Sequence, residues 1–311
     1  MKKIALLCAA LFLLSGCNRD SNQESPSPEI TTTVPITSQL PVTPTPTVSI
    51  TPTPQVTPSE STPIIETPTW EPAPSDGWDG NFDTLTLEDF PTHLITSSPE
   101  FFAATGLLRL IAQLPDEDTW LYGVYSPQEE QSLILRVGEA WTQLDLRYMT
   151  PRGIFPQMAY GDFDGDLDME LALILYTDSG TGVAITQLHI IEFGESGIWT
   201  DNYFAPGDYQ AILDQLVVYS YDQLSRTVTI QAEAGSITSI IPADQPDYTG
   251  PFPFGEIVSF QVEGDALSVS FGAAFTHVGS SVGDYIGDVT ADVVYTGSAF
   301  GLANLQAVPT A

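Results

Sequence analysis

The spacing of apolar and polar residues separates a polar N-terminal stretch from a long region with the periodicity of secondary structure. From Asp79 to the end, about 230 residues carry regular apolar spacing, which is enough chain to bury a substantial core. Short β-type runs dominate, and Thr227-Val228-Thr229-Ile230 alternates polar and apolar residues as a half-buried strand does. Strands are predicted at 120–125, 133–137, 141–146, 171–176, 185–193, 227–232, 257–262, 267–271, 289–295 and 301–308. The pattern predicts an α+β fold that is β-rich, with mostly antiparallel sheets and a few helices.

Two stretches of this region have the spacing of an amphipathic helix. The first covers 99–113, begins with a proline and carries an apolar stripe, although Gly106 interrupts it. The second covers 207–217, with Asp208 near its start and three aliphatic residues on one face. Residues 79–311 are therefore expected to form one β-rich globular domain. A division of that domain into two halves near 200–206 stays open.

The N-terminus has the organisation of an export signal. Two lysines precede an apolar run at Ile4–Leu13, which is too short to span a bilayer of about 30 Å and has the length of a signal-peptide core. The next residues, Leu14-Ser15-Gly16-Cys17, resemble a lipobox. That resemblance implies cleavage after a signal peptide at 1–16 and a diacylglycerol on the thiol of Cys17. The alternative is an ordinary secretory signal with a chance cysteine.

The chain has two cysteines, and the other one, Cys8, leaves with the signal peptide. A mature chain lipidated at Cys17 has no free thiol and no disulfide. This excludes a cysteine nucleophile, a cysteine zinc site and a disulfide scaffold. The folded part must therefore depend on its apolar core.

Residues 17–78 are expected to be a disordered linker that follows the lipidated cysteine. The tract is rich in proline and threonine, as in Thr-Pro-Thr-Pro-Thr at 43–47, and it lacks aromatic residues before Trp70. Such a composition buries too little apolar surface to offset the entropy of ordering. Proline-rich chains favour extended conformations, so the linker suits a tether that lifts a domain away from the membrane. A recognition role for this tract is the less favoured alternative.

The charge of the mature part excludes several partners. Both lysines lie in the signal peptide, so six arginines remain against 40 acidic residues, a net charge of −34. A nucleic-acid-binding protein needs a basic surface, and this composition supplies none. Electrostatic attraction to anionic lipid is excluded for the same reason, so the membrane is a partner only through the N-terminal lipid. The predicted location is extracytoplasmic, at the surface of the cell membrane.

The strongest chemical signal is a run in which acids occupy every second position. These candidate metal ligands are Asp162, Asp164, Asp166, Asp168 and Glu170. In a straight strand they would line up on one side, and two charges about 5 Å apart repel by roughly 3 kcal/mol at an effective dielectric constant near 20. A loop wound around a cation converts that repulsion into ligation, and calcium prefers six to eight hard oxygen ligands. The run therefore predicts a structural calcium site.

This run resembles the calcium loops of FG-GAP and VCBS-type repeats, which have the pattern Asp-x-Asp/Asn-Gly-Asp-Gly-x-x-Asp-Leu. The resemblance implies that the first three aspartates are ligands, that Asp168 contributes a backbone carbonyl and that Glu170 is the closing carboxylate. Two positions depart from the pattern: Leu167 stands where glycine is usual, and Glu170 replaces the commoner aspartate. The alternative is an acidic, solvated turn before a strand.

A wider set of motifs resembles a family of uncharacterised lipoproteins from Gram-positive bacteria. The shared motifs are Leu-Tyr-Gly at 121–123, Arg-Val-Gly at 136–138, Gly-Asp-Phe-Asp-Gly-Asp at 161–166, Glu-Leu-Ala at 170–172, Ser-Gly-Thr-Gly-Val at 179–183, Leu-His-Ile at 188–190 and Gly-Asp-Val-Thr-Ala-Asp-Val at 287–293. They cover about half of the chain. The resemblance implies surface attachment but no particular activity.

Other motifs carry little catalytic signal. Gly279-Ser280-Ser281-Val282-Gly283 matches the nucleophile elbow of hydrolases, but the residues that follow it do not predict the required helix. Residues 156–160 look unlike the strand that a phosphatase motif at 162–165 would need. The stretch 179–182 predicts a tight turn between two strands. His189 lies inside a strand pattern, which indicates packing rather than ligation.

The sequence assigns no catalytic residue and favours a non-enzymatic role. The leading hypothesis is a lipid-anchored surface protein with a calcium-stabilised domain that serves binding or envelope structure, with a cell-wall or surface partner left open. The alternative is an extracellular hydrolase acting on cell-wall glycan or peptide. Two carboxyl groups in a cleft with a perturbed pKa would favour the hydrolase.

Overall fold

The computed structural model describes residues 78–125, 132–194 and 199–310. The predicted signal peptide, the lipidation site Cys17 and all of the predicted linker except its last residue lie outside the described residues. That last residue, Trp78, is 6% exposed and packs against the domain, so the packed region includes it. Among the described residues, no helix combines the length and the apolar character needed to cross a membrane.

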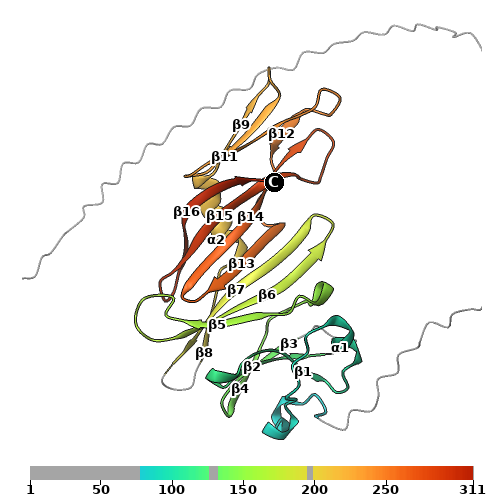
Figure 1. The fold of residues 1–311 in the computed structure, drawn as a ribbon, viewed down its shortest axis with the longest axis vertical. Coiled ribbons are helices and arrows are strands. Elements are labelled where there is room, and N and C mark those ends of the chain that lie inside the picture. The colour runs from blue at the N-terminus through green and yellow to red at the C-terminus, as the bar shows by residue number, and fades with distance from the viewer. Residues whose placement is uncertain (1–77, 126–131, 195–198, 311) are drawn as a thin grey trace, which may run out of the picture. The chain divides into compact units, whose positions relative to one another are not determined.

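The described chain is β-rich and mostly antiparallel, as the sequence predicts, and its strands form three sheets (Figure 1). The first sheet is a meander in the order β1-β2-β3-β4. Its strands are β1 (Leu108–Leu114), β2 (Thr119–Val124), β3 (Ser132–Val137) and β4 (Ala140–Leu144). A second meander has the order β11-β10-β9. Its strands are β9 (Val218–Asp222), β10 (Thr227–Gln231) and β11 (Ser236–Ile240).

The third sheet has nine strands and carries both the acidic run at 162–170 and His189. Its main path is β16-β15-β14-β13-β7-β6-β5, with β8 paired to β7 and β12 paired to β14. The strands are β5 (Gln157–Gly161), β6 (Glu170–Gly180), β7 (Val183–Phe193), β8 (Trp199–Tyr203), β12 (Tyr248–Pro251), β13 (Ile257–Glu263), β14 (Ala266–His277), β15 (Asp284–Tyr295) and β16 (Phe300–Pro309). Strands β13 and β7 pair in parallel, so segments on both sides of 200–206 belong to one sheet.

The helices agree with one expectation and correct another. Helix α2 (Pro206–Leu216) confirms the helix predicted at 207–217. The predicted helix at 99–113 is correct only in its first part, because α1 (Ser98–Ala103) ends early and the remaining apolar residues form β1. Gly106 takes a φ of +88°, which interrupts the helix. The first five residues of β1 are all buried, Arg109 among them, and such a mostly apolar run without alternation is ambiguous between a helix and a strand.

Short 3-10 helices complete the described elements. They are η1 (Phe82–Thr84), η2 (Leu87–Asp89), η3 (Pro115–Glu117) and η4 (Pro151–Gly153). A buried arginine connects α1 to β1: Arg109 donates from Nε to the carbonyl of Phe101 and from Nη2 to that of Ala104. Its guanidinium also lies 3.8 Å from the ring centre of Tyr125. The two hydrogen bonds and the ring contact offset part of the cost of burying this charge, while Nη1 is buried without a hydrogen-bond partner among the described residues.

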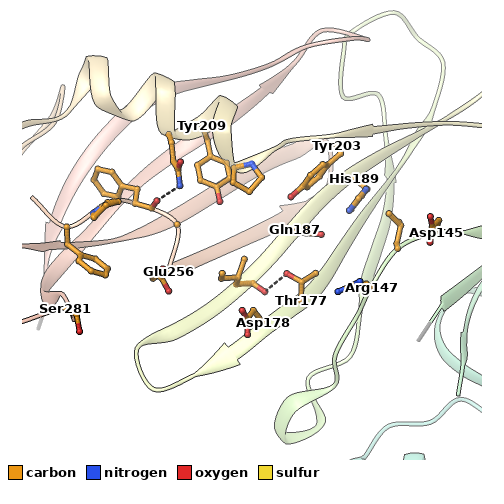
Figure 2. Close-up of a pocket in the computed structure, with 18 residues that line it drawn as sticks. Asp145, Arg147, Thr177, Asp178, Gln187, His189, Tyr203, Tyr209, Glu256 and Ser281 are labelled. Atoms are coloured by element: carbon orange, nitrogen blue, oxygen red, sulfur yellow. Dashed lines mark hydrogen bonds between the residues drawn. The ribbon is translucent and has the colours of Figure 1, made fainter. Parts of the chain in front are cut away.

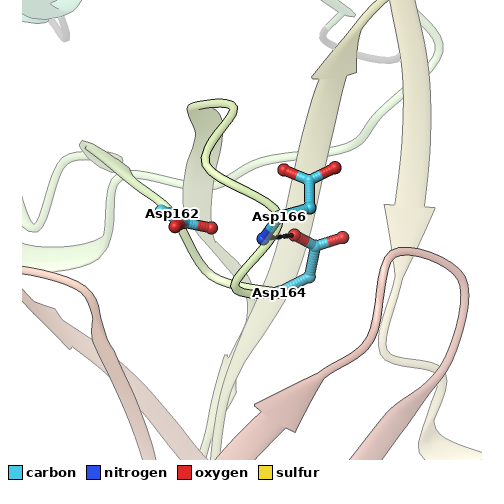
Figure 3. Close-up of side chains that lie close together, drawn as sticks. All are labelled: Asp162, Asp164 and Asp166. Atoms are coloured by element: carbon cyan, nitrogen blue, oxygen red, sulfur yellow. Dashed lines mark hydrogen bonds between the residues drawn. The ribbon is translucent and has the colours of Figure 1, made fainter.

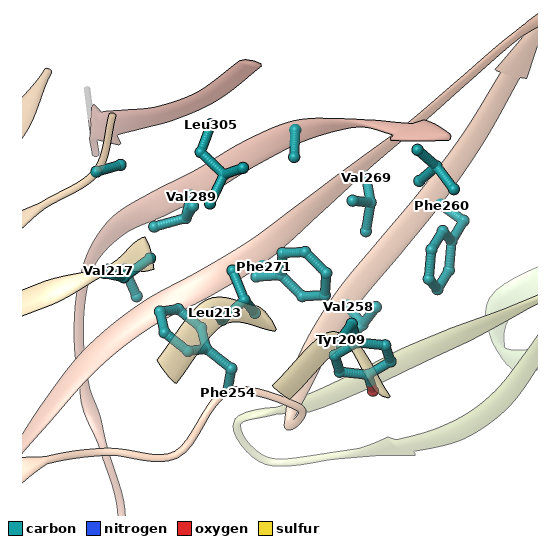
Figure 4. Packing of buried hydrophobic residues seen from close by; sticks show 14 of the residues in the cluster. Tyr209, Leu213, Val217, Phe254, Val258, Phe260, Val269, Phe271, Val289 and Leu305 are labelled. Carbon is teal, nitrogen blue, oxygen red and sulfur yellow. The ribbon is translucent and has the colours of Figure 1, made fainter. Parts of the chain in front are cut away.

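Buried apolar residues gather in layers on the faces of the sheets. In the largest cluster, Tyr209 and Leu213 of α2 pack with Phe271 of β14 and with the three-stranded sheet (Figure 4). A second cluster joins leucines of β2 and β3 to Leu171, Leu173 and Leu175 of β6. Alternate residues of β6 therefore enter different cores, as the two-residue period of a strand requires. This double burial fixes β6 and β7, the strands next to both candidate sites.

Candidate functional site

The acidic loop, residues 162–170, connects β5 to β6. Gly161 pairs with Glu170, so the two ends of the loop lie side by side across an antiparallel ladder. The structure brings Asp162, Asp164 and Asp166 together, each offering a carboxylate oxygen within 4.8 Å of the others (Figure 3). Asp162 and Asp164 are partly exposed and Asp166 is exposed. Three of the five predicted ligands therefore form one compact group.

Backbone N–H groups of the loop hold these carboxylates in place. Asp162 accepts hydrogen bonds from the N–H of Gly165 at 2.8 Å and of Leu167 at 3.2 Å. Asp164 accepts from the N–H of Asp166 at 3.1 Å. These hydrogen bonds fix the orientation of the two carboxylates relative to the loop backbone. The side chains are arranged by contacts within a few residues of chain.

The backbone at Leu167 explains the first departure from the repeat pattern. Leu167 has a φ of +78°, the left-handed region that favours glycine, and its side chain is 86% exposed. The loop therefore keeps the conformation that glycine would adopt, although leucine occupies the position. Because the side chain is exposed, packing does not exclude leucine from this position.

The other two predicted ligands do not join the compact group. The backbone N–H of Asp168 donates to the carboxylate of Asp166 at 2.8 Å, so Asp168 supports a neighbouring aspartate. Glu170 is 2% exposed, and its Oε2 accepts a hydrogen bond from the N–H of Phe163 at 2.8 Å. Burial raises the pKa of the Glu170 carboxyl, the Phe163 N–H opposes that rise, and the charge of Asp164 adds to it. Glu170 therefore ties the two ends of the loop together.

The turn between β15 and β16 also reaches the acidic loop. A Cβ at Gly297 would lie 2.7 Å from Oδ2 of Asp164, so this glycine permits a close approach. Nearby, the hydroxyl of Tyr295 donates to Oε1 of Glu192 at 2.5 Å. Burial and the negative charges of Glu192 and Asp164 raise the pKa of Tyr295. Sequence reasoning missed these neighbours because they lie far from the loop along the chain.

The geometry of the loop fits a calcium ion. Two oxygens that each lie about 2.3–2.6 Å from a shared ion are at most about 5 Å apart, which matches the carboxylate spacing. Asp162, Asp164 and Asp166 would hold the ion. They supply part of the six to eight oxygens that calcium takes, and backbone carbonyls or water would complete the shell.

A separate pocket lies beside β7 and is called the His189 pocket below. It has a volume of about 820 Å³. Gln187 and His189 of β7, Tyr203 of β8 and Tyr209 of α2 line it, and the loop between β12 and β13 forms another wall. Figure 2 shows His189 and Tyr203 at one end and Ser281 at the other. Sequence reasoning missed this pocket, whose walls come from segments between 145 and 281.

His189 is packed, as the sequence indicates, but it is also part of a dyad. It is 2% exposed, and its Nδ1 lies 2.9 and 3.0 Å from the two carboxylate oxygens of Asp201 on β8. Its ring stacks on Tyr203, with centroids 4.8 Å apart and planes 12° apart. Its Nε2 is buried and has no hydrogen-bond partner among the described residues. Recognising β8 as a strand would have placed Tyr203 opposite His189 and Asp201 two residues away on the same face.

The hydrolase-like motif around Ser281 does not form a nucleophile elbow. It lies between β14 and β15, two antiparallel strands, rather than between a strand and a helix. Ser281 and His189 occupy opposite ends of the pocket (Figure 2).

No family model, curated protein or solved structure matches this chain. The functional assignment therefore depends on the geometry of these two sites and on the N-terminal motif.

Proposed function

We propose that this chain is a lipid-anchored, extracytoplasmic surface protein with a non-enzymatic binding or envelope-structural role, and that calcium at the acidic loop stabilises its domain. The observation that carries the calcium assignment is the group of three carboxylates within 4.8 Å, held by the backbone of a loop with glycine-like geometry at Leu167. In a solvated acidic turn without an ion, repulsion between the three negative charges favours their separation.

The N-terminal motif supports the anchoring. Two acyl chains on Cys17 suffice for stable attachment, whereas the acidic composition offers no electrostatic contact with anionic lipid. Residues 17–78 would then separate the domain from the membrane. Extraction with detergent and mass measurement of the N-terminal peptide tests this part, with a diacylglyceryl-modified Cys17 as the expected first residue. A Cys17→Ala variant that stays in the membrane fraction would contradict it.

One feature favours binding over hydrolysis. The serine that lines the His189 pocket lies far from the histidine, so the pocket presents no serine–histidine pair (Figure 2).

Thermal unfolding of the full chain in detergent tests the calcium assignment. Extracellular calcium modules bind at about 0.1–1 mM, so a ten- to hundred-fold excess should stabilise the domain by about 1.4–2.7 kcal/mol relative to chelator. Asp164→Ala should remove this response. Asp244→Ala, which removes an exposed aspartate far from the loop in sequence, is the matched control and should retain it. An equal response in wild type and Asp164→Ala would place the ion elsewhere, and no response in wild type would leave a solvated turn.

A further inference from the structure

The dyad gives the His189 pocket a defined hydrogen-bonding group at one end. A carboxylate can only accept, so Nδ1 of His189 carries the hydrogen that it donates to Asp201. In the neutral ring, Nε2 is then an acceptor, and it has no partner among the described residues. Leaving such a group buried and unpaired is unfavourable, because it loses the hydrogen bond that it would make to water. A buried polar group without a partner calls for an explanation, and a ligand in the pocket would supply one.

Nearby polar groups extend this end into a hydrogen-bonding surface. Gln187 lies two residues before His189 on β7, so the two side chains share a face of the strand. The Gln187 amide offers both a donor and an acceptor. Donors and acceptors therefore occur together. This mixture suits hydroxyl groups, each of which donates and accepts.

Aromatic residues line other parts of the pocket. Tyr209 of α2 is 2% exposed and lies beside Phe271, with ring centres 5.0 Å apart. Phe252 and Phe254 come from the loop between β12 and β13, and Gln210 donates to the carbonyl of Phe254 at 2.6 Å. That hydrogen bond fixes the loop against α2. Phe252 and Tyr203 are partly exposed, so their rings offer apolar surface to the C–H groups of a ligand.

The charged groups exclude anionic ligands. Asp145, Asp178 and Glu256 line the pocket with Arg147 as the single arginine among its lining residues. The mature chain is strongly acidic as well, so its overall field repels anions. A ligand must therefore be neutral or cationic. The donor on the Gln187 amide favours a neutral ligand, because a cation would use acceptors alone.

We infer that the His189 pocket binds a neutral saccharide, with hydroxyl groups hydrogen-bonded at the His189 and Gln187 end and C–H faces against the aromatic walls. A volume of about 820 Å³ lies within the range of about 300–1,000 Å³ for small-molecule sites. This inference deepens the proposed binding role by naming a ligand class. It does not depend on calcium or on the lipid.

Isothermal titration of the full chain in detergent with three neutral trisaccharides (maltotriose, cellotriose and the trimer of N-acetylglucosamine) tests the inference. At least one should bind. Gln187→Ala and His189→Ala should each weaken that binding by about tenfold, the loss expected for one hydrogen bond. Gln187→Ala leaves the dyad intact, so it keeps the test valid if His189→Ala fails to fold.

His277→Ala is the matched control. His277 forms the same kind of pair, with Nδ1 3.0 Å from a carboxylate oxygen of Asp284, but it does not line the pocket. Its removal should change the affinity by less than about twofold, as expected for a residue outside the pocket lining. The inference is overturned if none of the trisaccharides binds, if both pocket variants bind as wild type does, or if spermidine binds in their place. Any of these results would leave the calcium response unchanged, so the two proposals fail separately.

Discussion

The acidic loop and the His189 pocket stabilise their polar groups in opposite ways. In the loop, aspartates near the surface accept hydrogen bonds from N–H groups only two to five residues away. In the pocket, a histidine that is 2% exposed depends on a carboxylate from the neighbouring strand, an aromatic stack and walls built on the main core. We therefore expect the loop to keep its geometry when the core is weakened. We expect the pocket to lose its geometry under the same change.

The largest expected effect comes from Phe271→Ala. Phe271 is fully buried and its ring lies 5.0 Å from Tyr209 and 6.3 Å from Phe254, so the change leaves a cavity behind two pocket walls. It should lower the free energy of unfolding by about 3–5 kcal/mol, measured by urea denaturation. Val294→Ala on β15, at a side chain 43% exposed, should cost less than about 0.5 kcal/mol. A folded Phe271→Ala protein should keep its calcium response and lose saccharide binding; loss of the calcium response would contradict the independence of the two sites.

Alkaline pH should affect the pocket through Tyr209. Burial raises the pKa of its phenol from 10.0 to about 12. The unfolded chain therefore loses this proton at lower pH than the folded chain, so stability falls as pH rises from about 10 towards 12. Urea denaturation at several pH values should show a smaller fall in Tyr209→Phe than in wild type. Parallel pH profiles for the two proteins would mean that the phenol is not held in a buried environment.

A moderate effect is expected at the close approach of Gly297 to Asp164. Gly297→Ala places a Cβ 2.7 Å from Oδ2 of Asp164 and forces alanine into a φ of +75°. Gly182→Ala has the same φ of +75° without any atom within 4 Å of its Cβ. It therefore measures the cost of placing alanine at a positive φ without a steric clash. Both changes should cost about 1–2 kcal/mol in thermal unfolding with chelator. Only Gly297→Ala should weaken calcium binding, and equal affinities in the two variants would show that this turn does not constrain the loop.

The smallest expected effect is at Leu167, where the side chain is exposed and φ is +78°. Leu167→Gly removes about 1–2 kcal/mol of backbone strain from the folded state. The new glycine also raises the conformational entropy of the unfolded chain, which lowers stability by about 0.4–1 kcal/mol. The net result should be a gain of about 0.5 kcal/mol in unfolding free energy. Leu224→Gly, at a leucine 99% exposed and outside the positive-φ residues, should instead be destabilising. A loss of stability in Leu167→Gly would contradict the strained geometry.

The same contrast explains what the sequence could predict. Alternating runs such as 227–232 identified strands, because burial on one face leaves a period-two pattern. The run that forms β1 is buried on both faces and lacks that pattern, so it was wrongly predicted as helix. The weakly apolar segment at 157–161 forms β5 through its pairing with β6, although it looked unlike a strand.

The two sites differ in predictability for a related reason. The three loop aspartates lie within five consecutive residues, so their spacing alone predicted that their carboxylates would lie together. The His189 pocket depends on Asp201 in a strand that the sequence did not indicate, and on α2 and the 252–256 loop. No local pattern links these segments, because the sheet brings them together only after folding.

Calcium titration of the full chain by calorimetry tests the central claim most directly. We expect one site with a dissociation constant of about 0.1–1 mM. Asp162→Ala should abolish calcium binding, and Asp244→Ala should retain it. The absence of binding to wild type, or the same affinity in wild type and Asp162→Ala, would contradict the assignment of the acidic loop as a calcium site.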